Sequence, residues 1–271
     1  MLARIKAILK RVLYKPVIKV PVYVPTLVSE LLKGRVALIT GGTNGIGKAI
    51  ARAYLSAGAK VIISGRSQEK INGVVEDLGE NCQGVYLDAL DVRSFKEKIN
   101  QLPPFDILVN NAGVVGGGLI GSVVECDYDK VLDTNLKGSF FMAQEVSKKW
   151  IAEGVKGNIL NICSTSSLRP GVSPYILSKW GMRSLTIGLA KSLIKHDIVV
   201  NGLAPGLTNT PQFVGIEGAI DNNKNPAGRL VTEAEVANMA TILVSGIGRM
   251  VVGDIVYLGG GAGVVTVDDL K

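Results

Sequence analysis

A glycine-rich segment between an apolar run and a helical pattern constrains the fold of this chain more than any other feature. Residues 40–47 read TGGTNGIG, directly after the apolar residues 36–39 and before the alanine-rich stretch 48–57. In a strand-turn-helix unit, Gly41 would permit the tight turn, Gly45 would let the backbone approach a diphosphate, and Gly47 would allow the helix to pack closely on the strand. The amino end of the helix would then face the phosphates. This context predicts a dinucleotide-binding turn.

The remainder of the chain alternates short β-branched runs with helical patterns. The runs lie near residues 36–40, 60–64, 83–87, 107–110, 158–163, 198–202 and 255–258. Such alternation is typical of a parallel sheet with helices on both faces, and right-handed crossovers bring the carboxyl ends of the strands to one edge, where ligands bind. We therefore predict an α/β fold, a doubly wound parallel sheet (Rossmann fold) in three layers. A T-x-x-E capping box at Thr232 should begin the last long helix.

Length and composition fit one domain preceded by an extension. The 271 residues suffice for one large core, and we predict a single Rossmann-fold domain over residues 33–271 after a basic amphipathic extension over residues 1–32. Mean hydropathy is +0.31, but the apolar runs are too short and too interrupted to span a bilayer. We expect no transmembrane helix.

Most of the positive charge lies in the extension. The net charge is +7, and residues 1–33 contain seven Lys/Arg and one acid. Cations and apolar side chains of residues 1–13 fall on opposite sides of a helix that Pro16 would end. The extension either packs on its own domain or a neighbouring subunit, or contacts an anionic membrane through residues 1–15.

These charges also bear on partners and location. Because the body of the chain is almost neutral, nucleic acid is not an expected partner. The charges of the extension interleave with its apolar residues, which argues against a secretory signal. We expect a cytoplasmic protein, peripheral at the membrane surface if the second reading of the extension holds.

Cysteine and histidine usage indicates neither a disulfide framework nor a metal site. Cys82, Cys126 and Cys163 are far apart and lack C-x-x-C spacing, so neither bridges nor zinc are predicted. Cys163 is interpreted as strand packing rather than a redox group. The single histidine, His196, is expected in a surface loop.

Residues near the end of the second predicted strand bear on the choice of dinucleotide. An acid there would bond the ribose 2′-hydroxyl of NAD, but residues 61–67 read VIISGRS and contain no acid. The guanidinium of Arg66 suits a 2′-phosphate instead. NADP is therefore predicted over NAD, although Asn44 does not supply a second basic group from the glycine-rich turn.

Several ordered motifs resemble the short-chain dehydrogenases/reductases in their short, single-domain form. They are TGGTNGIG at 40–47, NNAG at 110–113, Asn135 within DTNLKG, Ser164 after NIC, YILSK at 175–179 and APGLTNT at 204–210. The resemblance runs from about residue 33 to 261. It implies an NADP(H)-dependent oxidoreductase that transfers a hydride between nicotinamide and a carbonyl or secondary alcohol, and a homo-oligomer, either a dimer or a tetramer.

The resemblance also implies the residues of a cofactor site. Asp91 and Val92 would hold the adenine, and Asn110, Ala112 and Gly113 would line the adenosine ribose. The full set expected at the cofactor is Gly41, Thr43, Asn44, Gly45, Ile46, Gly47, Arg66, Asp91, Val92, Asn110, Ala112, Gly113, Tyr175, Lys179, Pro205, Gly206, Thr208 and Thr210, the last two at the carboxamide.

The implied reaction centre consists of Asn135, Ser164, Tyr175 and Lys179. Carbonyl reduction needs a proton donor whose pKa is close to the working pH, whereas a phenol ordinarily ionises near pH 10. A lysine four residues later shares the helix face and stabilises the phenolate. Ser164 would bond the substrate oxygen, and Asn135 would fix a water in a proton relay. Ser164 stands 11 residues before Tyr175, slightly closer than in most relatives, and the neighbouring hydroxyls 165–167 are its competitors.

Two other functions stay open at this point. A 3-oxoacyl-carrier-protein reductase of lipid synthesis would let the basic extension meet an acidic carrier. A non-catalytic nucleotide-binding scaffold would use the same fold, although the intact catalytic set argues against it. Specificity is expected to reside in the aperiodic loop 207–230.

Overall fold

A seven-stranded parallel sheet forms the centre of the molecule. The computed structural model describes residues 29–116, 118, 120–210 and 226–262. The strand order is β3-β2-β1-β4-β5-β6-β7, and every pairing is parallel. The strands are β1 (Val36–Ile39), β2 (Lys60–Gly65), β3 (Cys82–Tyr86), β4 (Ile107–Asn110), β5 (Asn158–Ile162), β6 (Val199–Pro205) and β7 (Ile255–Leu258). The predicted doubly wound sheet is confirmed.

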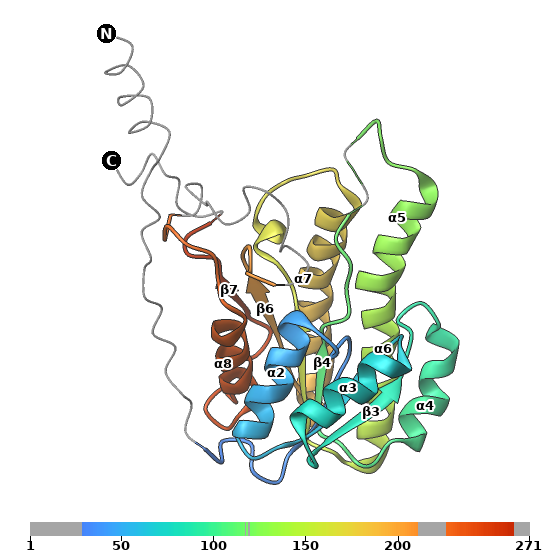
Figure 1. Ribbon diagram of the computed structural model, residues 1–271, viewed down its shortest axis with the longest axis vertical. Helices are drawn as coiled ribbons and strands as arrows, with labels where there is room; N and C mark the ends of the chain where they lie inside the picture. Colours follow the sequence, from blue (N-terminus) through green and yellow to red (C-terminus); the bar gives the residue numbers. More distant parts are fainter. Residues whose placement is uncertain (1–28, 117, 119, 211–225, 263–271) are drawn as a thin grey trace, which may run out of the picture.

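Helices cover both faces of this sheet (Figure 1). One face carries α2 (Gly45–Ser56), α3 (Gln68–Leu78) and α8 (Glu233–Val244). The other carries α4 (Phe95–Gln101), α6 (Gly138–Glu153) and α7 (Pro174–Leu193), with α5 (Glu125–Leu132) leading into α6. Three layers result, as predicted.

Alternation along each strand divides the core in two. In β1, Ala37 and Ile39 pack under α2 and α8, whereas Leu38 packs under α4, α6 and α7. Successive side chains of a strand point to opposite faces, so a strand covered on both faces must be apolar throughout. All four residues of β4 are buried, which explains why this run shows no polar alternation in the sequence.

The chain order of the strands reverses between β1 and β4. The crossover from β1 leads to β2 on one side, and β4 pairs with the opposite edge of β1. Loops that leave the carboxyl ends of β1 and β4 therefore separate to opposite faces and open a crevice, the usual ligand site of a doubly wound sheet.

Two local features differ from or add to the predicted elements. Helix α2 begins at Gly45, three residues earlier than expected, so the glycine-rich turn contributes to its first turn. Between α5 and α6 lies a π-helical turn, η2 (Asp133–Lys137), which the sequence pattern does not reveal. The capping box is confirmed: Thr232 Oγ1 accepts from Glu235 N, and the Glu235 carboxylate accepts from Thr232 N.

Residues 1–28 of the basic extension, with the helix predicted over residues 1–15, lie outside the described residues, as does most of the loop 207–230. Within the described part of the chain, no helix is both long and apolar enough to cross a bilayer.

Candidate active site

One cavity of about 1200 Å³ opens at the carboxyl edge of the sheet, across the point where the strand order reverses. A drug-sized ligand fills a site of roughly 300–1000 Å³, so this cavity has room for a dinucleotide and a second molecule. Most of the predicted residues line it: Gly41, Thr43, Asn44, Gly45, Ile46, Gly47, Arg66, Ala112, Gly113, Ser164, Tyr175, Lys179, Pro205, Gly206, Thr208 and Thr210. Asp91, Val92, Asn110 and Asn135 do not.

The glycine-rich turn requires glycine for two different reasons. Gly41 has φ +64°, a left-handed conformation that side chains disfavour, and a Cβ there would lie 2.9 Å from Ala112 Cα. Gly47 has no such backbone constraint, but its Cβ would lie 2.4 Å from Gly41 O. The first glycine makes the turn and the third brings α2 against it, as predicted.

Asn111 fixes this turn and was missed at the sequence level. Its Nδ2 donates to the carbonyls of Thr40 and Gly41 at 3.0 and 2.9 Å, and its side chain lines the cavity. Asn110, the predicted residue, is 2% exposed and turns inward, where its Nδ2 donates to Asn161 Oδ1 at 2.9 Å. The NN pair at the end of β4 thus has one structural and one cavity-facing member, because successive side chains point to opposite sides.

The two residues predicted to hold the adenine lie three positions after the residues that line the cavity. Asp88 and Ala89 line the cavity, whereas Asp91 and Val92 lie beyond it. Strand β3 ends at Tyr86, so only the first residues after it remain at the sheet edge. The Asp91 carbonyl accepts from Ser94 Oγ at 2.9 Å in a short 3-10 turn that leads away.

Two cations stand at the end of β2. Arg66 follows the strand directly, and Lys70 lies in the first turn of α3; both line the cavity and both are exposed. The Lys70 backbone is held by the Ser67 hydroxyl, which accepts from Lys70 N at 3.3 Å. Lys70 supplies the second basic group that Asn44 lacks, a feature visible only once α3 is seen to begin beside the cavity.

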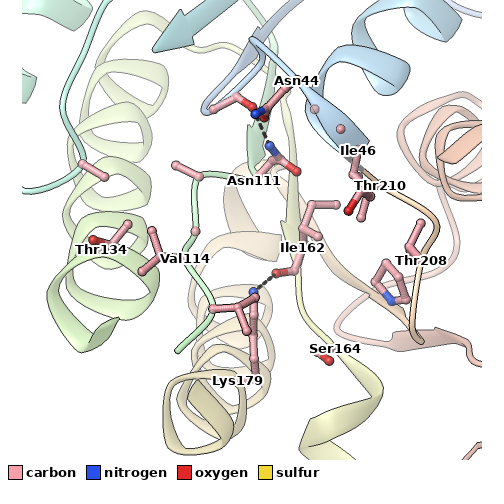
Figure 2. A pocket seen from close by; sticks show the side chains of 18 of the residues that line it. Asn44, Ile46, Asn111, Val114, Thr134, Ile162, Ser164, Lys179, Thr208 and Thr210 are labelled. Carbon is pink, nitrogen blue, oxygen red and sulfur yellow. Dashed lines mark hydrogen bonds between the residues drawn. The ribbon is translucent and has the colours of Figure 1, made fainter. Parts of the chain in front are cut away.

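Tyr175 and Lys179 lie on the first turns of α7, one above the other. Ser173 caps the helix by accepting from Ile176 N at 3.2 Å, so Tyr175 stands at the positive end of the helix dipole. The Lys179 ammonium is 5.8 Å from the centre of the Tyr175 ring and donates to Ile162 O at 2.9 Å. Figure 2 shows the hydrogen bond from Lys179 to Ile162, with Ser164 nearby. Lys179 is only 7% exposed, so a negative charge nearby is strongly favoured.

Among the four adjacent hydroxyls, Ser164 is the best placed to donate a proton into the cavity. Its Oγ accepts from Ser166 N at 3.1 Å, which leaves its O–H free to donate. Ser167 is fully buried, and its hydroxyl donates to Ser164 O at 2.8 Å. Thr165 and Ser166 also line the cavity, but Thr165 packs its methyl toward Gly259.

Asn135 lies in the π-helical turn and is not among the described residues that line the cavity. Its Oδ1 accepts from Val114 N at 2.8 Å, and its Nδ2 donates to Val114 O and to Ser178 Oγ, both at 3.0 Å. Both amide donors are thus used. The Ser178 hydroxyl in turn donates to Tyr175 O at 2.7 Å, so Asn135 ties the segment after β4 to the helix of the reaction centre.

Past β6, one buried hydroxyl faces the cavity without a partner. Thr208 Oγ1 donates to Gly206 O at 2.9 Å, but Thr210 Oγ1 is buried with no hydrogen-bond partner among the described residues. Figure 2 shows Thr208 and Thr210 on the same side of the pocket. A buried polar atom left unpaired is costly, which fits a ligand group that bonds there.

The remaining polar residues behave as structural groups. Cys82, Cys126 and Cys163 are free thiols. Burial raises the pKa of the Cys163 thiol, although Lys179 partly opposes this, so the thiol is kept unreactive. His196 is exposed in the turn after α7, as expected. Within the described residues, no group of three or more His, Cys, Asp or Glu side chains is placed to hold a metal ion.

The sequence pattern of the family described as short chain dehydrogenase matches residues 35–218. The chain is 35% identical over 243 residues to the 3-oxoacyl-[acyl-carrier-protein] reductase of Aquifex aeolicus, a match covering 85% of this chain and 98% of the relative.

Solved structures show the same likeness. A gluconate 5-dehydrogenase from Burkholderia cenocepacia, in complex with NADP and tartrate, aligns with a TM-score of 0.80 at 33% identity, over 86% of this chain and 97% of that one. A 3-ketoacyl-(acyl-carrier-protein) reductase from Brucella melitensis, complexed with NADH, aligns with a TM-score of 0.78 at 28% identity, over 86% and 99% of the two chains.

Proposed function

Because this chain belongs to the short-chain dehydrogenase family, we propose that its cavity binds NADP(H) and reduces a carbonyl, or oxidises a secondary alcohol, with Tyr175 as the acid/base. The chain is an NAD(P)-dependent oxidoreductase of that family. The single observation that supports the proposal most is the Tyr175–Lys179 pair beside the Ser164 hydroxyl in one cavity.

The described residues fit a bound dinucleotide with a 2′-phosphate. The glycine-rich turn and the amino end of α2 would hold the diphosphate, and Arg66 with Lys70 would hold the 2′-phosphate through charge-assisted hydrogen bonds. Asp88 and Ala89 would replace Asp91 and Val92 at the adenine. The unpaired Thr210 hydroxyl fits the nicotinamide carboxamide. When bound, the dinucleotide supplies the hydride.

The protein's own groups handle the proton. In reduction, the Tyr175 hydroxyl would donate its proton to the oxygen of the substrate, and the resulting phenolate is stabilised by the Lys179 ammonium and by the amino end of α7. Ser164 O–H would bond the same substrate oxygen while negative charge develops on it. We assign Asn135 as a positioning residue, since its amide holds Val114 and Ser178.

The test is consumption of NADPH, followed at 340 nm (the absorbance of the reduced nicotinamide) with ketones, quinones, sugars, sugar acids and acyl thioesters. The ratio of kcat/KM for NADPH over NADH should favour NADPH by about tenfold or more, and the variants Arg66→Ala and Lys70→Ala should each lower that ratio, because a single charged contact contributes about 1.5–3 kcal/mol. A tenfold preference for NADH in the wild type would overturn the cofactor assignment.

A 3-oxoacyl-carrier-protein reductase is the second candidate. The 35% identity to the Aquifex aeolicus enzyme with that name, over nearly its whole length, favours it. A gluconate dehydrogenase has comparable similarity in structure. Turnover of an acyl thioester but of no sugar acid would select the reductase of lipid synthesis.

We also propose that the chain forms a homo-oligomer and that residues 1–15 allow peripheral contact with membranes. Large apolar side chains are exposed along α6 and α7, among them Phe140, Leu177, Trp180 and Ile187, and such patches mark protein contacts. The membrane proposal rests on the cationic extension. Its test is co-sedimentation with anionic liposomes, which should fall when residues 26–271 replace the full chain; equal binding would reject it.

A further inference from the structure

We propose that Arg169 binds a carboxylate of the substrate, so that the enzyme acts on small oxo or hydroxy acids. The inference rests on the proposed function, since it names the substrate class of the same cavity. Arg169 lines that cavity together with Ser164 and Tyr175. Arg169 is the C-cap and Ser164 the N-cap of the short 3-10 turn η3 (Thr165–Leu168). One turn of chain therefore separates the Arg169 guanidinium from the Ser164 hydroxyl, which would bond the reacting oxygen.

The backbone that presents Arg169 is fixed at both ends. Trp180 Nε1 donates to Arg169 O at 3.0 Å, and Trp180 lies on α7, the helix of Tyr175 and Lys179. At the other end of the turn, the Ser167 hydroxyl donates to Ser164 O at 2.8 Å. A guanidinium held on a fixed backbone loses less freedom on binding than one on a free loop.

In the described part of the chain, the Arg169 guanidinium makes no ion pair and no hydrogen bond. The ion pairs of arginine there are made by Arg35, Arg52, Arg229 and Arg249. Its neighbour Arg183 is occupied structurally, since it donates to Ser167 O at 3.3 Å and lies 5.4 Å from the centre of the Trp180 ring. Arg169 is exposed at the cavity, and no described residue accepts a hydrogen bond from its guanidinium, whose donors are open to a ligand.

Charge around the cavity favours an anion at this end. Of the described lining residues, only Asp88 is acidic, and it lies after β3 on the adenine side. The cations divide between two ends: Arg66 and Lys70 after β2, and Arg169 with Lys179 around the reaction centre. The first pair suffices for the 2′-phosphate, so the second cationic end is left for the substrate. A planar guanidinium bonds a carboxylate with two parallel hydrogen bonds.

The experiment compares acids with their uncharged counterparts. NADPH consumption is measured with oxo acids of three to six carbons, with their methyl esters, and with an uncharged acyl thioester. We expect the wild type to prefer the acid over the ester by at least tenfold in kcat/KM. Arg169→Gln should erase at least tenfold of that preference, mainly through KM, and Arg169→Lys should retain part of it. Arg93→Gln, an exposed arginine outside the cavity lining, is the matched control.

A binding measurement keeps the inference separate from the proposed function. The full chain, with and without NADP⁺, is titrated in a calorimeter with succinate and malate and, separately, with their diamides. The affinity for each acid is compared with that for its diamide. Acids that bind at least tenfold more tightly than diamides, with the difference lost in Arg169→Gln, support the inference even if no compound is reduced. If compounds are reduced, equal kcat/KM for the acids and their esters would overturn the inference. If nothing is reduced, equal affinity for the acids and their diamides would overturn it. Oxo acids reduced equally well by wild type and Arg169→Gln would overturn it and leave the proposed function standing.

Discussion

At the scale of single residues, the proposed reaction centre is defined by the few donor groups that have no protein acceptor among the described residues. Among the described residues, Lys179 donates one N–H to Ile162 O, so two would be left for a ligand and a phenolate in the proposed reaction. Ser164 accepts from Ser166 N and keeps its proton. The Ser167 hydroxyl donates to the Ser164 carbonyl oxygen. The pattern of hydrogen bonds, rather than the presence of hydroxyls, separates the donor from its neighbours.

Two substitutions test this assignment. Tyr175→Phe removes only the acid/base hydroxyl, so kcat should fall by about 10²–10⁴-fold while NADPH still binds, as measured by fluorescence titration. Ser164→Ala should lower kcat by about tenfold or more because one donor to the developing charge is lost. Ser166→Ala is the matched control and should cost less. Near-normal rates in Tyr175→Phe, or a larger loss in Ser166→Ala than in Ser164→Ala, would reject these roles.

At the scale of elements, the first turn of α8 holds two carboxylates in opposite environments. Glu235 accepts from both Nη atoms of Arg229, at 2.9 and 2.6 Å, and this pairing lowers the pKa of Glu235 from 4.5 to about 2. Burial raises the pKa of Glu233, partly opposed by Lys48, and Glu233 Oε1 has no hydrogen-bond partner among the described residues.

The two carboxylates should affect stability with opposite signs. A lowered folded pKa means that Glu235 stabilises the protein above pH 4.5 and loses this effect as pH falls toward 2. Glu235→Gln should therefore lower Tm at pH 7 by about 2–4 °C, on the order of 1 kcal/mol, with the difference closing below pH 4.5. A raised folded pKa means that ionised Glu233 destabilises at neutral pH, so Glu233→Gln should raise Tm at pH 7 and have no effect at low pH. Thermal unfolding from pH 7 to 3 measures both, and parallel curves for the two variants would contradict the assignment.

The elements also show what the sequence can and cannot predict. Strand runs, the glycine-rich turn and the capping box were predictable because each depends on neighbouring residues. Asp91 and Val92, predicted at the adenine, lie outside the cavity lining, and this could not be foreseen because the end of β3 depends on its pairing with β2. Asn111 and Lys70 were missed because their roles come from contacts between separate segments. The π-helical turn at Asn135 leaves no local signal either.

At the scale of the whole molecule, the exposed stripes on α6 and α7 determine the expected assembly. Leu177, Trp180 and Ile187 recur at helical spacing on α7, each 40–48% exposed, and Phe140 is 44% exposed on α6. Both helices belong to the same covering layer. Sheet-covering helices normally turn apolar residues inward, so a second, outward stripe supports the proposed contact with another copy.

Light scattering after size-exclusion chromatography should report a dimer or tetramer for the full chain. A double variant, Phe140→Glu and Ile187→Glu, should shift the population toward monomer, because charges buried in an interface lack partners. Leu90→Glu, at an exposed apolar residue on the loop after β3, is the control and should leave the mass unchanged. Circular dichroism would verify folding. A monomeric wild type at micromolar concentration would contradict the oligomer.

The π-helical turn has a consequence for the lengths that this part of the chain tolerates. Its wide ring accommodates one residue more than an α-helical turn would, and Asn135 reaches Val114 from that position. Deleting one residue of this turn would let the helix continue as a regular α-helix with both flanks in place, but it would remove the wide turn from which the Asn135 amide reaches Val114. An in-frame deletion there would keep the helical content and uncouple the loop after β4 from the helix of Tyr175, so natural variants of this segment should differ by substitution and not by length.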